Sequence, residues 1–273
     1  MAMRWPSIAF AAIVAVLAAT VPLHARTLCT IVVDARDGVT LVREGACEDR
    51  VTPASTFKLA LAVMGFDSGF LKDATTPTLL FREGYPDWLG DIWRRDTNPT
   101  TWLEYSVVWY SQQIAKALGR ARLEAYARGF SYGNGDFSGD AGKDNGLERA
   151  WISSSLKISP VEQTAFLRRL VTDGLPVAAK AMAMTRSVTQ KTALEAGWIV
   201  HGKTGSAYPR RPDGSFDRNR GWGWFVGWAE RDGRLMVFAR LAQADGAGEK
   251  SGGRHVRTGF LGDFPAIAAS LPD

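Results

Sequence analysis

Apolar residues gather into short runs near both ends of the chain, and these runs predict β-strands. Near the N-terminus, residues 30–33 and 39–42 form two apolar runs around a turn at 36–38, which is the pattern of a hairpin. Near the C-terminus, an Asp232-Gly233 turn joins two further runs. The strands predicted in that region cover residues 197–208, 221–230 and 234–242.

Segments between these strands have the spacing and the start signals of helices. An apolar run at residues 59–66 follows Thr52 and Pro53, which we expect to be the N-cap and the first helical residue. A capping box at residues 159–162 opens a helix that extends through Leu170. Further helices are predicted at residues 112–127 and 254–271.

The predicted helix at residues 112–127 has an inner face marked by Ile114, Leu118 and Ala125. Residues 129–146 follow it and are rich in Gly, Asp and Asn. We expect a long loop there, and loops of that length in compact domains are often functional.

The order of these elements is a hairpin, a helical middle, three strands and a terminal helix. It predicts an α+β fold, with an antiparallel sheet built from both chain ends, flanked by helices, and with an inserted helical lobe. We expect a single domain at residues 26–273. Its sheet lobe would cover about 26–58 and 190–273, and its helical lobe about 59–189.

Residues 1–25 have the pattern of a secretory signal peptide. Arg4 precedes an apolar stretch at residues 8–19, and the small residue Ala25 precedes Arg26. The alternative is a membrane anchor, but the apolar stretch falls short of the ~20 residues that a membrane span needs. We therefore expect cleavage near Ala25 and an exported, periplasmic protein with no membrane attachment.

Composition indicates a soluble globular protein. Removal of the signal peptide leaves 273 − 25 = 248 residues, enough for one sizeable core. Hydrophobic residues make up 46% and charged residues 22%, both ordinary values. The pI is 9.3, but the mature net charge is only 32 − 28 = +4. The basic run from Arg210 to Arg220 is interrupted by a turn sequence at 212–214, so we expect a solvated hairpin loop and no nucleic-acid partner.

The chain has two cysteines, Cys29 and Cys47, and they flank the N-terminal hairpin. Paired strands would bring their sulfurs together, and an oxidising compartment would permit a disulfide. The alternative is two free buried thiols, and we favour the disulfide.

Histidines are scarce, which narrows the chemistry. After loss of the signal peptide only His201 and His255 remain. A multi-histidine zinc site is excluded, and no second part of a Ser-His-Asp triad is evident, so we expect no metal. A serine nucleophile in this chain would need activation by lysine.

Ser55 and Lys58 are the residues that fit this requirement. They stand three apart at the start of the predicted 59–66 helix, so their side chains share one face. A neutral lysine within reach can remove the proton of a serine hydroxyl, and the helix N-terminus offers N–H groups to an oxyanion. By itself a Ser-x-x-Lys spacing is expected about once by chance in such a chain.

Further polar clusters follow in a fixed order along the chain. Ser106-Val107-Val108 comes first, then Tyr132-Gly133-Asn134, Trp151 and finally Lys203-Thr204-Gly205-Ser206 on a predicted strand. Together with Ser55 and Lys58, this series resembles the class D (oxacillinase-type) serine β-lactamases within the β-lactamase and penicillin-binding protein family. The sibling class A has Ser-Asp-Asn where this chain has Ser106-Val107-Val108. The resemblance covers nearly the whole mature chain.

The resemblance implies an acyl-enzyme mechanism. Ser55 would attack the β-lactam carbonyl, and Lys58 would carry a carbamate made from carbon dioxide, the only cofactor expected. An apolar pocket of Phe57, Val108, Trp151 and Ile152 would lower the pKa of the Lys58 amine. The Trp151 indole N–H would hold the carbamate.

The resemblance also implies how the β-lactam substrate binds. Ser106 would relay a proton to the leaving nitrogen, and the backbone N–H groups of Ser55 and Ser206 would form the oxyanion hole. Arg254, or as the alternative Arg257, would bind the substrate carboxylate. Further substrate contacts are expected from Lys203, Thr204, Gly205, Tyr132 and Asn134.

Two other functions share these motifs. One is a β-lactam sensor domain that is acylated and stays acylated. The other is a penicillin-binding enzyme acting on D-Ala-D-Ala peptides, which has no need of an apolar carbamate pocket. The sequence favours the hydrolase, because the chain lacks the membrane-spanning segments of the sensors and has apolar residues around Lys58.

Overall fold

The computed structural model describes residue 1 and residues 25–246 and 252–270. The predicted signal peptide, apart from its two end residues, lies outside the described residues. Among the residues that are described, none of the helices has both the length and the apolar character needed to cross a membrane.

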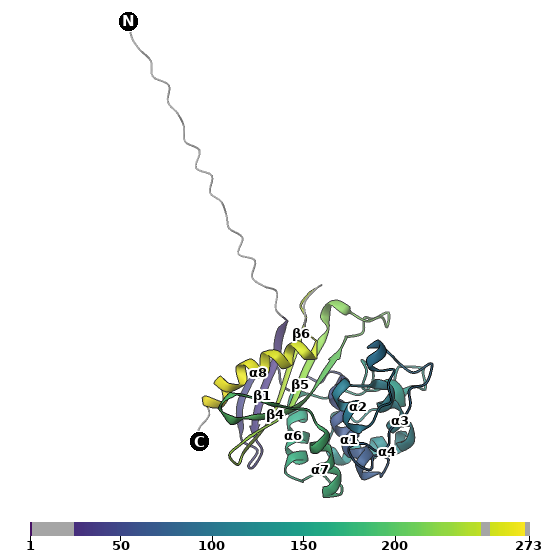
Figure 1. Ribbon diagram of the computed structural model, residues 1–273. Coiled ribbons are helices and arrows are strands. Elements are labelled where there is room, and N and C mark those ends of the chain that lie inside the picture. The colour runs from purple at the N-terminus through teal and green to yellow at the C-terminus, as the bar shows by residue number, and fades with distance from the viewer. Residues whose placement is uncertain (2–24, 247–251, 271–273) are drawn as a thin grey trace.

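A six-stranded antiparallel sheet forms the centre of the molecule, in the order β2-β1-β6-β5-β4-β3 (Figure 1). The N-terminal hairpin pairs with the last strand, Val32 lying opposite both Val42 and Phe238. The predicted sheet from both chain ends is therefore confirmed. The strands are β1 (Arg26–Asp34), β2 (Thr40–Gly45), β3 (Lys191–Ala193), β4 (Ile199–Ala207), β5 (Trp222–Arg231) and β6 (Arg234–Gln243).

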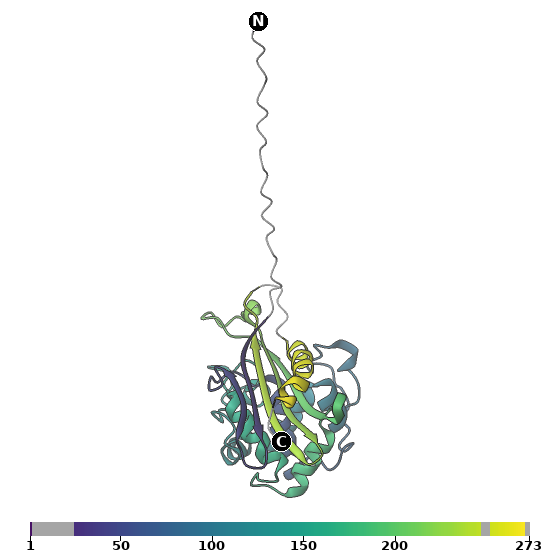
Figure 2. The ribbon, with the colours of Figure 1, turned by 90° about the vertical axis from the view of Figure 1, so that its left-hand side faces the viewer.

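Helices cover both faces of the sheet. Figure 2 looks onto the sheet, with α8 on the near side and the helices from the middle of the chain behind it. The helices are α1 (Phe57–Asp67), α2 (Pro99–Tyr105), α3 (Val108–Leu118), α4 (Arg120–Phe130), α5 (Gly146–Arg149), α6 (Pro160–Val171), α7 (Ala179–Val188) and α8 (Gly253–Ala269). A 3₁₀ turn, η1 (Ala54–Thr56), leads into α1.

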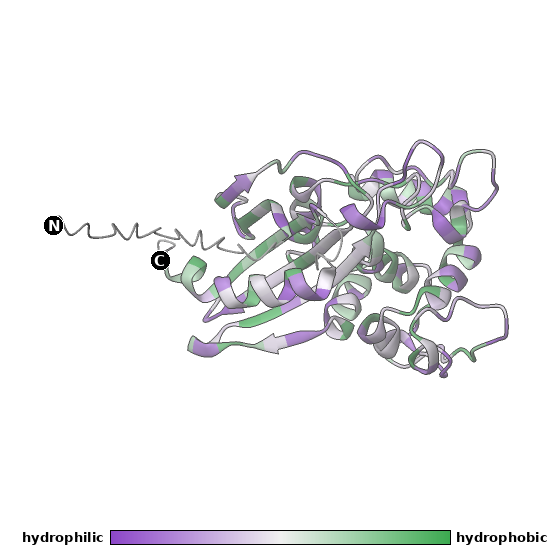
Figure 3. Cartoon of the chain, turned by 90° about the horizontal axis from the view of Figure 1, so that it is seen from above, coloured by the Kyte–Doolittle hydropathy of each residue, from purple (hydrophilic) through white to green (hydrophobic). Residues whose placement is uncertain are grey.

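Each face of the sheet has its own apolar core, because the strands bury alternate side chains on opposite sides. Under α8, the rings of Phe238 and Phe260 stack at 4.1 Å. The opposite core is larger and contains α1, whose first nine residues, 57–65, are all buried. Figure 3 shows hydrophobic stretches along the strands and hydrophilic ones in the outer loops. A helix that is apolar on all sides belongs in an interior, which places α1 at the centre of the protein.

The prediction of one continuous helix at residues 112–127 was wrong. The structure has two helices there, α3 and α4, separated at Gly119, whose φ of 76° is in the left-handed region. The break changes the phase of the helical pattern, so Ala125 is exposed, whereas Leu123 and Ala127 are buried. Helix α7 was not predicted.

Thr52 does not cap α1, contrary to expectation. The first turn is the 3₁₀ turn η1, which has no side-chain cap. Instead, the Thr52 hydroxyl donates to the Trp151 carbonyl at 2.9 Å and accepts from the Ser153 N–H at 3.1 Å. The capping box at the start of α6 is confirmed, since Ser159 Oγ accepts from the Glu162 N–H.

Cys29 and Cys47 form the disulfide that the sequence favours, with their Cα atoms 5.1 Å apart. The bond joins β1 to the segment that follows β2. Closing a loop of 18 residues reduces the entropy of the unfolded chain and stabilises the fold by about 3 kcal/mol.

Candidate active site

Ser55 and Lys58 meet where η1 passes into α1. Lys58 Nζ donates to Ser55 Oγ at 3.1 Å, and Lys58 is fully buried. Burial lowers the pKa of the Lys58 amine well below its usual value, and the charge of Lys203 lowers it further. The neutral form of the amine is therefore favoured relative to that of an exposed lysine, and a neutral amine can accept a proton or react with carbon dioxide.

The four residues predicted to form an apolar pocket around Lys58 are largely shielded from solvent. Phe57 and Val108 are buried, Ile152 is half-buried, and the rings of Phe57 and Trp151 lie 5.3 Å apart. Trp151 is 1% exposed, and its Nε1 has no hydrogen-bond partner in the structure. A buried donor of this kind nearly always has a partner, so an oxygen acceptor is expected next to it. A carbamate on Lys58 would supply such oxygens, and the pocket fits that group.

Strand β4 forms the opposite wall of the site. Strand β3 pairs with residues 199–201 of β4, and no strand among the described residues continues along that edge at residues 203–207. Lys203 is buried on this strand, and burial together with the charge of Arg254 lowers the pKa of Lys203 to about 8.

Glycines let three backbone segments meet at this wall. A Cβ on Gly205 would lie 2.8 Å from the Pro53 carbonyl oxygen, and one on Gly253 would lie 2.6 Å from the Gly205 carbonyl oxygen. The Gly253 N–H also donates to Ser206 Oγ at 2.8 Å. These close contacts hold η1, β4 and the start of α8 together.

Ser106 lies between α2 and α3 in a left-handed conformation, with φ 60° and ψ 36°. Few residues other than glycine adopt this conformation, and those that do are often found at functional sites. The bend places Ser106 at the same cleft as Ser55.

A cleft of about 610 Å³ brings together most of the predicted site. It is lined by the sequence-predicted residues Ser55, Ser106, Val108, Lys203, Thr204, Gly205, Ser206 and Arg254. Between the two arginine candidates the structure favours Arg254, because Arg257 donates to Thr192 Oγ1 at 2.7 Å and does not line the cleft.

Tyr132 and Asn134 do not line this cleft. Tyr132 is buried against Phe57, with ring centroids 5.7 Å apart. Asn134 lines a neighbouring cavity of about 890 Å³, where its Oδ1 accepts from the Lys157 N–H and its Nδ2 donates to the Ser155 carbonyl. Asn134 therefore supports the segment that follows Trp151, whereas Tyr132 packs in the core against Phe57 and Phe166.

Sequence reasoning missed the rim of the cleft. The rim includes Trp88, Leu89, Trp93, Tyr105, Tyr208, Arg218 and Trp222. The tryptophan-rich stretch at 88–93 was a visible signal for part of it, but nothing in the sequence placed that stretch near Ser55.

In the described part of the chain, no three His, Cys, Asp or Glu residues lie close enough together to hold a metal ion. His201 packs on Trp228 with ring centroids 4.8 Å apart, and its Nε2 lies 2.9 Å from Glu230. This histidine is a structural residue of β4.

Comparison with known proteins agrees with this geometry. Residues 28–263 match the family described as the penicillin binding protein transpeptidase domain. Beta-lactamase OXA-9 of Klebsiella pneumoniae is 44% identical over 239 residues, which cover 88% of this chain and 87% of that protein. Beta-lactamase OXA-1 of Escherichia coli is 35% identical over 213 residues, which cover 77% of this chain and 74% of that protein.

Solved structures give the same result. The crystal structure of the OXA-427 class D beta-lactamase superimposes with a TM-score of 0.82 and 41% identity, and the match covers 89% of this chain and 99% of that one.

Proposed function

Since this chain belongs to the class D β-lactamases, within the penicillin-binding protein transpeptidase family, we propose that it hydrolyses the β-lactam amide of penicillin-type antibiotics through an acyl-enzyme on Ser55. The matches cover 87% of the length of beta-lactamase OXA-9 and 99% of the OXA-427 chain. Its own residues supply each part of that reaction.

Ser55 is the nucleophile and Lys58 the group that activates it. Their 3.1 Å contact puts the serine proton within reach of the lysine side chain. Carbon dioxide, bound on the Lys58 amine as a carbamate, would supply a general base for both acylation and deacylation. Phe57, Val108 and Ile152 would surround the amine with apolar side chains, and the buried Trp151 N–H, which has no partner in the structure, would hold the bound group.

The remaining cleft residues bind the substrate and stabilise charge. The N–H groups of Ser55 and Ser206 would bind the oxyanion, and the Ser106 hydroxyl would pass a proton to the leaving nitrogen. Lys203, Thr204 and Arg254 would hold the substrate carboxylate, with Gly205 permitting the close approach of η1.

One observation supports this function most strongly: a fully buried lysine contacts a cleft serine, and Trp151, whose buried indole N–H lacks a partner, packs on Phe57, the residue before that lysine. The test is hydrolysis of a chromogenic cephalosporin over many turnovers, with Ser55→Ala as the inactive control. Continued turnover is expected. A single burst of one equivalent would indicate a β-lactam sensor, and cleavage of D-Ala-D-Ala peptides in preference to β-lactams would indicate a peptidoglycan enzyme.

We also propose that residues 1–25 are a cleaved signal peptide and that residues 26–273 act in the periplasm as one catalytic domain. The domain would have a sheet lobe at about 26–58 and 190–273 and a helical lobe at about 59–189. The basic start and short apolar stretch of the leader support this proposal. N-terminal sequencing of protein from the periplasmic fraction should begin near Arg26, whereas an intact Met1 would contradict it.

A further inference from the structure

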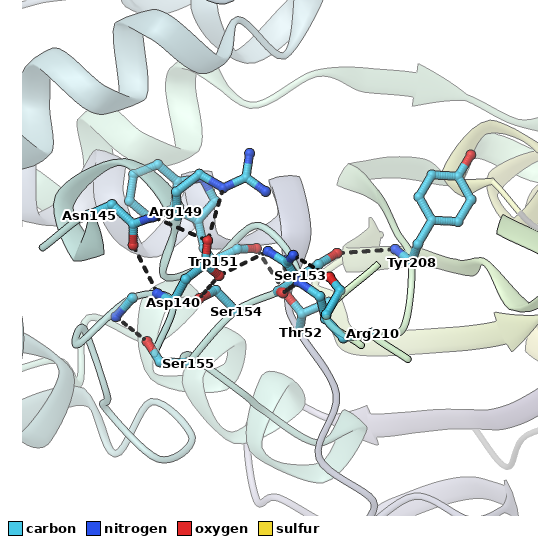
Figure 4. A network of polar contacts seen from close by, with 12 residues as sticks. Thr52, Asp140, Asn145, Arg149, Trp151, Ser153, Ser154, Ser155, Tyr208 and Arg210 are labelled. Carbon is cyan, nitrogen blue, oxygen red and sulfur yellow. Dashed lines mark hydrogen bonds and ion pairs between the residues drawn. The ribbon is translucent and has the colours of Figure 1, made fainter. Parts of the chain in front are cut away.

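The backbone that follows Trp151 is held in an unusual conformation. Ser153 has a φ of 54°, in the left-handed region, although it is 7% exposed and not a glycine. Such a conformation persists only where the surroundings impose it. The contacts that impose it come from two distant parts of the chain (Figure 4).

Three hydrogen bonds hold Ser153. Its N–H donates to Thr52 Oγ1 at 3.1 Å, its Oγ accepts from the Tyr208 N–H at 3.1 Å, and its carbonyl accepts from Arg210 Nε at 3.1 Å. Thr52 lies three residues before Ser55, whereas Tyr208 and Arg210 lie in the β4–β5 connection. The segment that carries Trp151 is therefore attached on one side to the nucleophile turn and on the other to the end of β4.

Asp140 completes this network from the long loop between α4 and α5. Its Oδ1 accepts from Arg210 Nη2 at 2.9 Å and from Ser154 Oγ at 2.7 Å, and its Oδ2 accepts from Asn145 Nδ2 at 3.1 Å. Arg149 Nε lies 4.0 Å from the Oδ2 atom of Asp140.

Asp140 is ionised in this setting. Burial alone raises the pKa of its carboxyl, but the hydrogen bonds from Ser154 and Asn145 and the charges of Arg210 and Arg149 outweigh burial, so that the pKa is lowered. A charged, hydrogen-bonded pair is stronger and more directional than a neutral contact.

None of these groups touches the reacting atoms. Asp140, Ser153 and Arg210 line the neighbouring 890 Å³ cavity and not the cleft that contains Ser55. Their shared feature is that they fix the backbone on either side of Trp151, whose own carbonyl accepts from Thr52 Oγ1. A shift of this backbone would move the unpartnered indole N–H relative to Lys58.

We propose that Asp140 and Arg210 are positioning residues that hold the Trp151 N–H in place beside Lys58 and thereby set the affinity of Lys58 for carbon dioxide. This inference rests on the proposed function. It assigns a purpose to the long loop between α4 and α5, which brings Asp140 to Arg210 across 70 residues of sequence.

The test compares Asp140→Asn with Arg211→Gln. The second variant removes an ion pair between Arg211 and Asp217 at 3.1 Å, and both of these residues lie within the same β4–β5 connection. Each protein is titrated with ¹³C-bicarbonate, and the carbamate signal is followed by NMR alongside β-lactam turnover.

For Asp140→Asn we expect the half-saturating bicarbonate concentration to rise at least fivefold. Deacylation should slow about tenfold at ambient bicarbonate, and saturating bicarbonate should restore much of that loss. Arg211→Gln should titrate like the parent protein. Unchanged titration in Asp140→Asn, with only a lower melting temperature, would overturn the positioning role.

A second variant keeps the test decisive if Asp140→Asn does not fold. Arg210→Lys retains the charge opposite Asp140 but cannot reach both Asp140 and the Ser153 carbonyl as a guanidinium does, so the same rise is expected. A parent protein with no carbamate signal would refute the proposed mechanism itself. A normal parent signal with parent-like variants would refute only the role of Asp140 and Arg210.

Discussion

At the scale of single residues, reactivity depends on what burial does to two lysines. Lys58 is fully buried beside apolar side chains, which disfavours its charged form. Lys203 is also buried, but the pKa of its amine falls only to about 8, so it stays mostly charged at neutral pH. Under the proposed function, the same residue type would therefore react with carbon dioxide on one wall and bind the substrate anion on the other.

Replacement of Trp151 tests the donor beside Lys58. Trp151→Phe keeps an aromatic ring against Phe57 but removes the indole N–H. We expect deacylation to slow roughly 10–100-fold, so that acyl-enzyme accumulates, with a smaller effect on acylation. Mass spectrometry of the quenched reaction measures the accumulation. Trp228→Phe, a change at the His201 stack, is the control, and identical steady-state rates in both variants would contradict the assignment.

The pH dependence of kcat/KM tests Lys203. Its pKa of about 8 belongs to the folded enzyme, where burial and Arg254 disfavour the charged form. The charged, carboxylate-binding form thus predominates below pH 8 and is lost above it. With bicarbonate kept saturating, kcat/KM should fall as the pH rises through about 8, because this ratio reports the free enzyme. A profile that stays flat to pH 10 would show that the Lys203 charge is not needed.

At the scale of elements, the site depends on three backbone segments that pack without side chains between them. Gly205 in β4 lies against the Pro53 carbonyl before Ser55, and Gly253 at the start of α8 lies against Gly205. This packing sets the distance between the serine and the strand that is expected to bind substrate.

A methyl group at Gly205 should disturb this distance. Gly205→Ala places a Cβ 2.8 Å from the Pro53 oxygen, so η1 and β4 must separate. We expect kcat/KM to fall about 100-fold, the usual effect of a displacement of about 1 Å in an active site. The control is Gly262→Ala in α8, where the added methyl meets open space and raises helix propensity. Equal activity of the two variants would contradict the packing argument.

Local signals explain which elements could be predicted. The capping box at Ser159, the Asp232-Gly233 turn and the strands read from short apolar runs each depend on neighbouring residues, and all three were predicted correctly. The break at Gly119 was missed because Ala125 is apolar and fits the spacing of Ile114 and Leu118, although the structure exposes it. Thr52 was misassigned because its partners, Trp151 and Ser153, are about 100 residues away in sequence.

The same distinction applies to the candidate site. Ser55, Lys58, Ser106 and Lys203 were found because each belongs to a short motif, and the structure brings all four to one place. The aromatic rim and the Asp140–Arg210 pair have no such motif, since they form only when distant loops meet. Tyr132 and Asn134 belong to a short motif too, but their side chains face the core and the neighbouring cavity.

At the scale of the whole molecule, charge is distributed unevenly around the cleft. Lys203, Arg218 and Arg254 line it, and Glu104 is the single acidic residue among the described lining residues. Arg218 is exposed on the β4–β5 connection, with its guanidinium 5.5 Å from the centre of the Tyr208 ring. A positive cleft attracts anionic substrates from solution.

Added salt should weaken this attraction. Between about 20 and 200 mM salt the Debye length shortens to below 10 Å, so kcat/KM for a singly anionic penicillin should fall severalfold. Arg218→Gln should give a flatter salt dependence, whereas Lys180→Gln on α7, outside the cleft, should leave it unchanged. Stopped-flow hydrolysis at several ionic strengths measures the slopes. Equal slopes for all three proteins would exclude a steering role for Arg218.

The central claim is that the buried Lys58 amine takes up carbon dioxide and so activates Ser55. The most direct measurement is β-lactam turnover by enzyme that has been degassed and depleted of carbon dioxide, followed as bicarbonate is added back. We predict a saturable rise in activity from a low starting rate, absent in Lys58→Arg. Full activity in the depleted enzyme, with no response to added bicarbonate, would contradict the account.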